Sequence, residues 1–379
     1  MTTEPPAAPP SAPSAPKDAS SEPSLPPDPR LAHLPRDPRL SHPSWPLPRI
    51  IVYHQTHFAN TEQGPQQHIS LLPLLSESPI AVTHVILAAI HLNDQPGDIT
   101  LNDDPYRAPK NDVVWAEART LRSHGIKVMG MLGGAAQGSY RRLDQDDARE
   151  FQRFYTPLRD MVRWAALDGL DLDVEEHMSL AGVVRLVLQL RRDFGPRFVI
   201  TLAPVATALQ ERPPGLLGLD AQSLVSMMAG HKRHTNLSGF SYRELEKAVG
   251  PEIDWYNAQF YCGWGNAEST VGYDRIVAPL QPVEKGDEKG AGWAPERVVL
   301  GLITNPEKGQ GWVEDEVLYE TLLVLTAKYE GFAGVMGWEY FESITAQEPF
   351  GWPWSWARLM TRILRPDVEE KGKSDQAST

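Results

Sequence analysis

The feature that most constrains this chain is the acidic stretch Leu167–Glu176, which reads LDGLDLDVEE. In an extended strand successive side chains point to opposite sides, so the stretch places three carboxylates on one face and three apolar side chains on the other. The carboxylates belong to Asp171, Asp173 and Glu175, and the apolar side chains to Leu170, Leu172 and Val174. Burying like charges roughly 6–7 Å apart opposes folding. The apolar face requires a packed layer, which disfavours an exposed acidic strand or an isolated metal-binding loop and indicates a functional site.

Seven further segments have the nearly continuous apolar character of buried parallel strands, and helical patterns separate them. The expected strands cover residues 49–53, 82–90, 127–132, 167–176, 198–203, 254–261, 298–303 and 334–338. The expected helices include residues 113–123, 146–166, 180–194, 241–249, 314–329 and 355–364. Strands alternating with helices over about 300 residues predict a closed α/β (β/α)8 TIM barrel rather than an open doubly wound sheet. No dinucleotide-binding glycine pattern follows the first strand. Barrel active sites lie at the C-terminal ends of the strands, where Glu175 is the outermost of the three carboxylates.

The barrel accounts for only part of the chain. Residues 1–47 are rich in Pro, Ala and Ser, with too few apolar side chains to offset the entropy of ordering, so we expect a disordered tail. We assign residues 48–366 to the barrel. The polar residues 367–379 are expected to form a second disordered tail.

Composition bears on location and partners. The N-terminal segment lacks the basic start and apolar core of a secretory signal, and no run of about 18 apolar residues indicates a membrane span. The single cysteine, Cys262, excludes an intramolecular disulfide, which favours the cytoplasm. The formal net charge of −13 argues against a nucleic-acid partner. We therefore expect a cytoplasmic monomer with no cofactor and no bound metal.

The carboxylate column indicates acid catalysis. Neighbouring carboxylates raise one another's pKa, so one of them stays protonated and can donate its proton to a leaving oxygen. Glu175 is the natural acid. In most glycosidases a second carboxylate lies about 5–5.5 Å away in retaining enzymes and about 6.5–9.5 Å away in inverting ones. Here the other two acids lie beneath Glu175 on the same strand, so we infer that the nucleophile comes from the substrate itself.

At these residues the chain resembles glycoside hydrolase family 18. The segment Asp168–Glu175 matches the family's DGxDxDxE signature, and its substrate-assisted mechanism is an exception to the two-carboxylate scheme. Four further segments resemble strands three, six, seven and eight of the family's class III (hevamine-type) chitinases. They are Gly133-Gly134 with Gly138–Tyr140, Gln259–Tyr261, the sequence GLITNPEKGQGW, and Gly334–Trp338.

The resemblance implies a retaining mechanism with a role for each site residue. Glu175 protonates the glycosidic oxygen while the 2-acetamido group of N-acetylglucosamine attacks the anomeric carbon, giving an oxazolinium intermediate. Asp173 orients and polarises the acetamido group and shares a proton with Asp171, and Tyr261 hydrogen-bonds the acetamido oxygen. The residues expected to bind the sugar are Gln259 as a support, Trp338 as the apolar floor, Tyr53 at the end of the first strand, and Gly133 and Gly134.

Other interpretations of some of these residues stay open. Tyr261 and Trp338 also suit a barrel core, and Gly133-Gly134 also suits a simple turn after a strand. In the sequence HQTH, His54 and His57 lie three residues apart without an accompanying carboxylate ligand, which favours structural histidines over a metal pair.

Two residues depart from the family's pattern. Met131 replaces the serine that usually begins the SxGG motif of the third strand, and Cys262 stands where class III enzymes commonly have asparagine after the tyrosine. We therefore expect the sugar-binding subsite to differ in shape. No carbohydrate-binding module is evident, so we do not expect crystalline chitin as the natural substrate.

Three functions remain. The leading prediction is a chitinase-like hydrolase of β-1,4 bonds after N-acetylglucosamine, acting on chitin fragments or chito-oligosaccharides. The alternatives are an endo-β-N-acetylglucosaminidase that cuts the chitobiose core of N-glycans, and an inactive N-acetylglucosamine-binding lectin, which the retained Glu175 disfavours.

Overall fold

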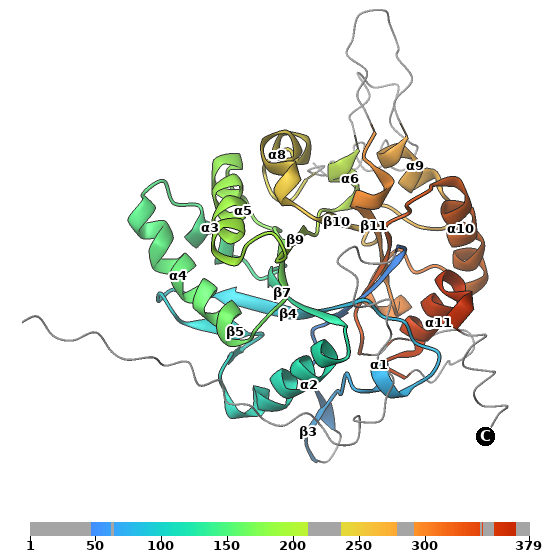
Figure 1. Ribbon diagram of the computed structural model, residues 1–379, viewed down its shortest axis with the longest axis horizontal. Helices are drawn as coiled ribbons and strands as arrows, with labels where there is room; N and C mark the ends of the chain where they lie inside the picture. The colour runs from blue at the N-terminus through green and yellow to red at the C-terminus, as the bar shows by residue number, and fades with distance from the viewer. Residues whose placement is uncertain are drawn as a thin grey trace, which may run out of the picture.

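Eight parallel strands form the centre of the molecule, and helices surround them (Figure 1). The computed structural model describes residues 47–61, 64–210, 236–278, 292–341, 343 and 352–368. In this part of the chain the barrel strands are β1 (Arg49–His54), β4 (His84–Leu92), β7 (Lys127–Gly133), β8 (Gly169–Asp173), β9 (Val199–Leu202), β10 (Trp255–Gln259), β11 (Val298–Ile303) and β12 (Gly334–Trp338). All eight strands expected from the sequence are confirmed, although the acidic strand is shorter at both ends.

The sheet closes on itself. Neighbouring strands follow the order β1-β12-β11-β10-β9-β8-β7-β4, and β4 also pairs with β1. One edge of β1 places Arg49 opposite Gly334 of β12, and the other edge places Ile51 opposite His84 of β4. All the pairings around this ring are parallel. The structure therefore excludes an open doubly wound sheet and confirms the TIM barrel.

The described part of the chain contains ten α-helices. They are α1 (Pro73–Ser76), α2 (Asp112–Ser123), α3 (Ser139–Leu143), α4 (Ala148–Trp164), α5 (Leu180–Phe194), α6 (Ala206–Leu209), α8 (Tyr242–Val249), α9 (Val271–Val277), α10 (Asp315–Lys328) and α11 (Ser355–Leu364). At the start of α5 the hydroxyl of Ser179 accepts a hydrogen bond from the backbone N–H of Gly182. At its end Gly195 has a φ of 78°, a conformation that glycine adopts without strain.

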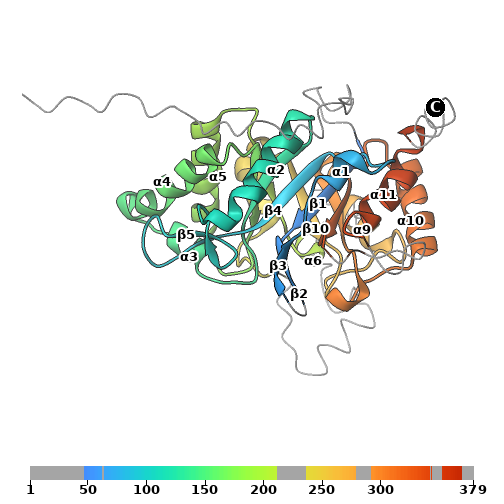
Figure 2. The same cartoon turned by 90° about the horizontal axis from the view of Figure 1, so that it is seen from below.

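Short antiparallel strands extend the barrel where the sequence pattern did not predict them. β5 (Ile99–Leu101) pairs with the end of β4, and β6 (Asp104–Pro105) pairs with β5. β2 (Phe58–Thr61) and β3 (Gly64–His68) form a hairpin after β1 that projects from the barrel (Figure 2). Short 3-10 turns complete the described elements at Pro109–Asn111, Gly250–Glu252, Pro295–Arg297 and Pro306–Lys308.

Two apolar clusters divide the outside of the barrel from its interior. Leu170 and Leu172 belong to the larger cluster, which packs the strands against the helices. The smaller cluster fills the barrel and includes Ile51 and Met129. On β8 the same alternation turns the side chains of Asp171 and Asp173 away from the outer cluster and into the barrel, where they are buried. The predicted division of the acidic strand into an apolar and an acidic face is confirmed.

The predicted tails lie almost wholly outside the described residues, at 1–46 and 369–379. Their disorder and the domain boundaries therefore stay predictions. Among the described residues, no helix combines the length and the apolar character needed to cross a membrane.

Candidate active site

The three carboxylates lie at different depths along the barrel. β8 ends at Asp173, so Glu175 follows the strand rather than belonging to it. This corrects the expectation that the strand continues to Glu176. Asp171 is fully buried, Asp173 is 6% exposed, and Glu175 is half-buried at the mouth. The acid expected to meet the substrate is therefore the most accessible of the three.

The deepest carboxylate, Asp171, is held by three side chains. Its Oδ1 accepts hydrogen bonds from Thr201 Oγ1 (2.6 Å) and Asn257 Nδ2 (3.0 Å), and its Oδ2 accepts one from the Tyr53 hydroxyl (2.8 Å). Burial raises the pKa of Asp171, and these three hydrogen bonds act in the opposite direction. Both of its oxygens already have donors, and the proton that it is expected to share with Asp173 stays a prediction.

Asp173 and Glu175 are connected through Gln259. The Nε2 atom of Gln259 lies 3.2 Å from Asp173 Oδ1, 3.4 Å from Glu175 Oε1 and 2.9 Å from the carbonyl oxygen of Ala203. Burial raises the pKa of both carboxyl groups, and the charges of Glu175 and Asp171 raise the pKa of Asp173 further. The hydrogen bond from Gln259 partly offsets the rise at Glu175. Because two neighbouring carboxylates resist carrying two charges, burial and their mutual repulsion favour keeping one proton on the pair.

The two carboxylates line a pocket of about 470 Å³. Its walls are formed by Gln55, Ala89, His91, Met131, Gly133, Gly134, Ala135, Ala136, Asp173, Glu175, Leu237, Gln259, Tyr261, Cys262, Trp264 and Trp338. Asp173 and Glu175 are the only carboxylates in this set. The pocket can therefore protonate a bound ligand from one side, and the described residues of its lining supply no carboxylate from the opposite wall.

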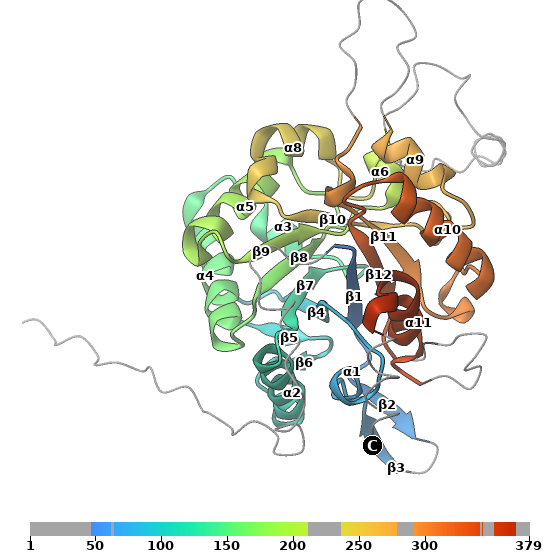
Figure 3. The same ribbon diagram turned by 45° about the vertical axis from the view of Figure 1, so that its right-hand side comes forward.

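Tyr53 does not line this pocket. Its side chain is 1% exposed, and its hydroxyl donates to Asp171 below the pocket floor. β1 and β12 are neighbours in the barrel (Figure 3), and the ring of Tyr53 lies 5.7 Å from that of Trp338. Tyr53 therefore supports the site from beneath, and the sugar contact that the resemblance implied for it stays a prediction. Burial raises the pKa of Tyr53 well above its usual range, and the charge of Asp171 raises it further.

Gly133 and Gly134 shape the wall beside the acid column. Both have positive φ angles, 89° and 92°. A Cβ atom on Gly133 would lie 2.4 Å from Tyr140 Cε2 and 2.6 Å from the carbonyl oxygen of Asp173. The backbone N–H of Gly134 donates to that same oxygen at 2.9 Å. The pair is thus a turn in tight contact with β8, and it also forms part of the pocket lining.

Several pocket residues were given no role in the sequence analysis, and Gln55, His91 and Trp264 are those with polar or aromatic side chains. Gln55 follows β1, His91 lies near the end of β4, and Trp264 lies in the turn after β10. The signal that could have found them is their position, because side chains at the C-terminal ends of barrel strands gather around one mouth.

Glu339 is a buried carboxylate directly behind the pocket wall. It is 2% exposed. Its oxygens accept hydrogen bonds from the backbone N–H groups of Gln55 (3.0 Å) and Thr56 (2.8 Å) and from the hydroxyl of Thr56 (2.7 Å). Because Glu339 follows Trp338 in the chain, these contacts hold Gln55 and Trp338 on one side of the pocket.

His54 and His57 pack against each other beneath the rim. Their rings meet edge to face at 4.6 Å. The Nε2 atom of His57 lies 3.0 Å from the carbonyl oxygen of Ala88, and that of His54 lies 3.2 Å from the carbonyl oxygen of Thr56. Burial lowers the pKa of His57 to about 4 and the pKa of His54 well below its usual range. Across the described ranges, no three His, Cys, Asp or Glu side chains are grouped as metal ligands. The two histidines are packing residues.

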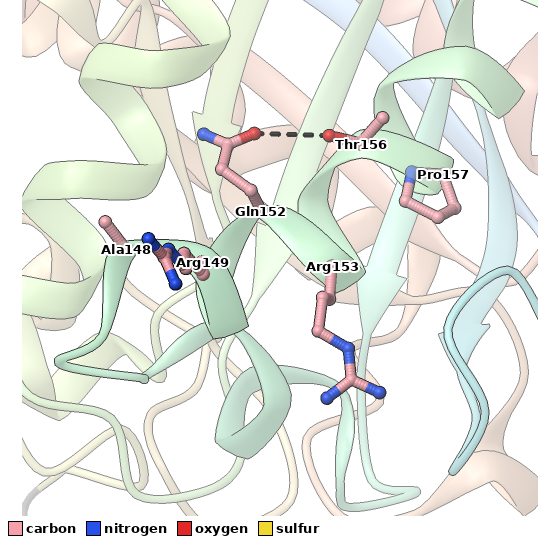
Figure 4. Close-up of a pocket in the computed structure, with 6 residues that line it drawn as sticks. All are labelled: Ala148, Arg149, Gln152, Arg153, Thr156 and Pro157. Atoms are coloured by element: carbon pink, nitrogen blue, oxygen red, sulfur yellow. Dashed lines mark hydrogen bonds between the residues drawn. The ribbon is translucent and has the colours of Figure 1, made fainter.

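A second depression lies on the outer surface of α4 (Figure 4). It is lined by Ala148, Arg149, Gln152, Arg153, Thr156 and Pro157. The Thr156 hydroxyl donates to Gln152 Oε1 at 3.2 Å, and no carboxylate belongs to the lining. This surface has none of the acid chemistry of the barrel mouth.

The sequence profile described as glycosyl hydrolases family 18 matches residues 49–308 of the chain. A comparison with curated proteins found no match.

Solved structures show similarity over most of the chain. A fungal endo-beta-N-acetylglucosaminidase from glycosyl hydrolase family 18 is 43% identical, with a TM-score of 0.70, and the match covers 85% of this chain and 99% of that one. The chitinase ChiC from Aspergillus fumigatus is 49% identical, with a TM-score of 0.66, and the match covers 83% and 98%. A family 18 chitinase from Pseudoalteromonas aurantia, at 20% identity and a TM-score of 0.56 over 83% and 100%, shares the fold.

Proposed function

Because the chain belongs to glycosyl hydrolase family 18, we propose that it is a chitinase-like enzyme that hydrolyses β-1,4 bonds after N-acetylglucosamine in chitin fragments or chito-oligosaccharides. One observation carries the mechanism: among the described residues, Asp173 and Glu175 are the only carboxylates that line the pocket, and both approach it from β8 and the loop that follows it. In this part of the chain no carboxylate faces them across the pocket, which supports a mechanism in which the substrate's own acetamido group supplies the nucleophile. The similarity to chitinase ChiC supports the choice of substrate.

In the first step Glu175 donates its proton to the glycosidic oxygen as the bond to the anomeric carbon breaks. The acetamido oxygen forms the new bond to that carbon, and the resulting oxazolinium ion carries a positive charge. Asp173 lies next to Glu175 in the pocket, where its carboxylate can accept a hydrogen bond from the acetamido N–H and stabilise that charge. The leaving sugar departs with the proton as a neutral alcohol.

In the second step Glu175, now ionised, removes a proton from a water molecule. The water oxygen attacks the anomeric carbon and displaces the acetamido oxygen, so the configuration is retained after two inversions. The raised pKa of Glu175, caused by burial, suits the first step because it keeps the carboxyl group protonated at a higher pH.

A second function is favoured by one comparison. The fungal endo-beta-N-acetylglucosaminidase is 43% identical to this chain, and the match covers 85% of this chain. Cleavage within the chitobiose core of N-glycans uses the same acetamido nucleophile, and would place a glycosylated peptide or protein beyond the cleaved bond.

The experiment compares the parent protein with Glu175→Gln, which keeps the size of the side chain and removes the acidic proton. Glu320→Gln, on the exposed face of α10, is the matched control. Each protein is incubated with chito-oligosaccharides and with an N-glycosylated peptide, and the products are identified by mass.

The chitinase proposal predicts short N-acetylglucosamine oligomers from the parent and the Glu320→Gln control, and none from Glu175→Gln. A peptide left with a single N-acetylglucosamine, without cleavage of chito-oligosaccharides, would establish the second function instead. Sugar binding without any product would leave the lectin alternative, and equal turnover by Glu175→Gln would remove Glu175 from the mechanism.

A further inference from the structure

The side chain of Glu175 lies in the pocket although its backbone lies beyond the end of β8. β8 ends at Asp173, so the alternation of a strand no longer determines the direction of the side chains beyond it. Glu175 nevertheless lines the pocket and lies 3.4 Å from Nε2 of Gln259 on β10. A group outside the strand must hold this part of the backbone in place.

The next residue, Glu176, is anchored on the other side. Its side chain is 9% exposed. Oε1 accepts hydrogen bonds from the backbone N–H groups of Gly138 and Tyr140, both at 2.8 Å, and Oε2 lies 2.9 Å from the Gly138 nitrogen. Gly138 ends the loop that joins β7 to α3, which is residues 134–138, and Tyr140 lies in the first turn of α3. The side chains of Glu175 and Glu176 therefore reach different neighbours, one in the pocket and one in this loop.

The β7–α3 loop and the start of α3 are themselves held by hydrogen bonds to the barrel strands. The backbone N–H of Gly134 donates to the carbonyl oxygen of Asp173 at 2.9 Å, and the hydroxyl of Tyr140 donates to the carbonyl oxygen of Leu132 at 2.6 Å. The hydroxyl of Ser139 accepts a hydrogen bond from the backbone N–H of Leu92 at 3.0 Å. Glu176 thus binds to a loop that is already attached to β8, β7 and β4, which makes it a fixed point for the chain after Asp173.

We propose that Glu176 is a positioning residue for the catalytic acid: by binding the backbone of the β7–α3 loop, it fixes the peptide after Glu175 so that the Glu175 carboxyl group stays in the pocket. This role rests on the proposed function of Glu175 as the proton donor. Glu176 itself lies behind the pocket wall and does not belong to the pocket lining.

The position of the Glu175 carboxyl group determines its acidity. Burial raises its pKa. The other titratable side chains that line the same pocket are Asp173, Tyr261, Cys262 and His91. If Glu176 is removed, Glu175 gains access to water, and its pKa falls toward the ordinary value for glutamate. A catalytic acid with a lower pKa is ionised at a lower pH, so the rate of hydrolysis should begin to fall at a lower pH.

The test uses two variants of Glu176 and one control. Glu176→Ala removes all the contacts to Gly138 and Tyr140. Glu176→Gln keeps an oxygen that can accept from both N–H groups and places an amide where Oε2 stood, so it is the conservative variant. Ser139→Ala removes a different anchor next to the loop, the one that attaches the start of α3 to β4, and leaves Glu176 intact. A loss caused only by loosening of the loop would appear in Ser139→Ala as well.

The first readout is the pKa of Glu175, followed by NMR through its carboxyl carbon and assigned by the signal that disappears in Glu175→Gln. This measurement does not require turnover, so it stands even if the proposed function fails. The pKa is expected to fall in Glu176→Ala, to fall less in Glu176→Gln, and to stay at the parent value in Ser139→Ala.

The second readout is kcat across pH on whichever oligosaccharide the parent cleaves. Because misplacement by about 1 Å can cost about a hundredfold in rate, Glu176→Ala is expected to lower kcat by about that factor. Glu176→Gln is expected to lose about tenfold or less, and the fall of kcat with rising pH should move to lower pH in both. If Glu176→Ala does not fold, Glu176→Gln carries the comparison.

The proposal is overturned if the Glu175 pKa is unchanged in the Glu176 variants, or if Ser139→Ala lowers it equally. An inactive parent with the expected pKa changes would refute the hydrolase function and leave the positioning role supported. If the parent is active and the Glu176 variants keep its Glu175 pKa and its kcat, only the positioning role is refuted.

Discussion

The substitution Tyr53→Phe separates two roles for a residue that the sequence placed in the sugar pocket and the structure places beneath it. It removes one hydroxyl and little else, and that hydroxyl donates to Asp171 Oδ2 at 2.8 Å. Thr201 and Asn257 continue to donate to the other oxygen. The variant therefore weakens the support of a buried carboxylate without opening a large cavity.

The magnitude follows from the charge on the acceptor. A hydrogen bond to a charged group contributes about 1.5–3 kcal/mol, and one pKa unit corresponds to about 1.4 kcal/mol. Where Asp171 is ionised, Tyr53→Phe should lower the free energy of unfolding by about 1.5–3 kcal/mol, and it should raise the pKa of Asp171 further because the ionised form loses the stronger hydrogen bond.

The pH dependence has a definite sign. Burial already raises the pKa of Asp171 in the folded state, and a group with a raised pKa contributes stability that is present below its unfolded pKa, about 3.9, and is lost as pH rises through the folded value. Tyr53→Phe raises that folded value further. Its destabilisation is therefore largest near neutral pH, and falls in acid to that of a neutral hydrogen bond, about 0.5–1.5 kcal/mol.

Urea unfolding at about pH 7.5 and at about pH 3.5, below the unfolded pKa, measures the difference, and KM for the cleaved oligosaccharide is measured beside it near neutral pH. KM should stay within about twofold of the parent, since the Tyr53 ring does not line the pocket. Tyr261→Phe is the matched control because Tyr261 does line the pocket, so it should impair turnover with a smaller effect on unfolding. A large rise in KM for Tyr53→Phe with unchanged stability would refute the assignment of Tyr53 to Asp171.

Three further predictions follow from the site and the tails. Asp173→Asn should lower kcat by about one to several powers of ten if Asp173 positions the internal nucleophile, and a rate within about twofold of the parent would exclude that role. Glu339→Ala should raise KM by about tenfold, because Gln55 and Trp338 lose their common anchor; Glu339→Gln, which keeps an acceptor oxygen, should raise it less, and equal effects would contradict this explanation. Removing residues 1–43 should leave the thermal midpoint nearly unchanged, and a drop of many degrees would show that this segment packs.

The two faces of the acidic strand could be predicted from the sequence because the alternation of side chains is a local pattern. Alternation along a strand needs no information from elsewhere in the chain, so the inward direction of Asp171 and Asp173 and the outward direction of Leu170 and Leu172 followed directly. The eight-strand barrel followed from the repetition of such segments. Cytoplasmic location and a monomeric state were inferred from composition alone, and both stay predictions.

The structure decided which residues meet across the barrel. Tyr53 and Asp171 are 118 positions apart in the chain, and Gln259 and Glu175 are 84 apart. No local pattern sets the register of such pairs, because it depends on how eight strands close around one core. That closure brings the hydroxyl of Tyr53 to Asp171, a contact that no local pattern predicts.

Glu175 illustrates what the sequence predicts and what only the tertiary structure determines. The sequence identified Glu175 by its place in the carboxylate column, because strand periodicity gives each residue a side. The strand then ends at Asp173, and beyond that point periodicity has no physical basis. Only tertiary contacts, from Gln259 on one side and from the β7–α3 loop through Glu176 on the other, determine where the carboxyl group lies, since a loop takes its conformation from the surfaces it packs against.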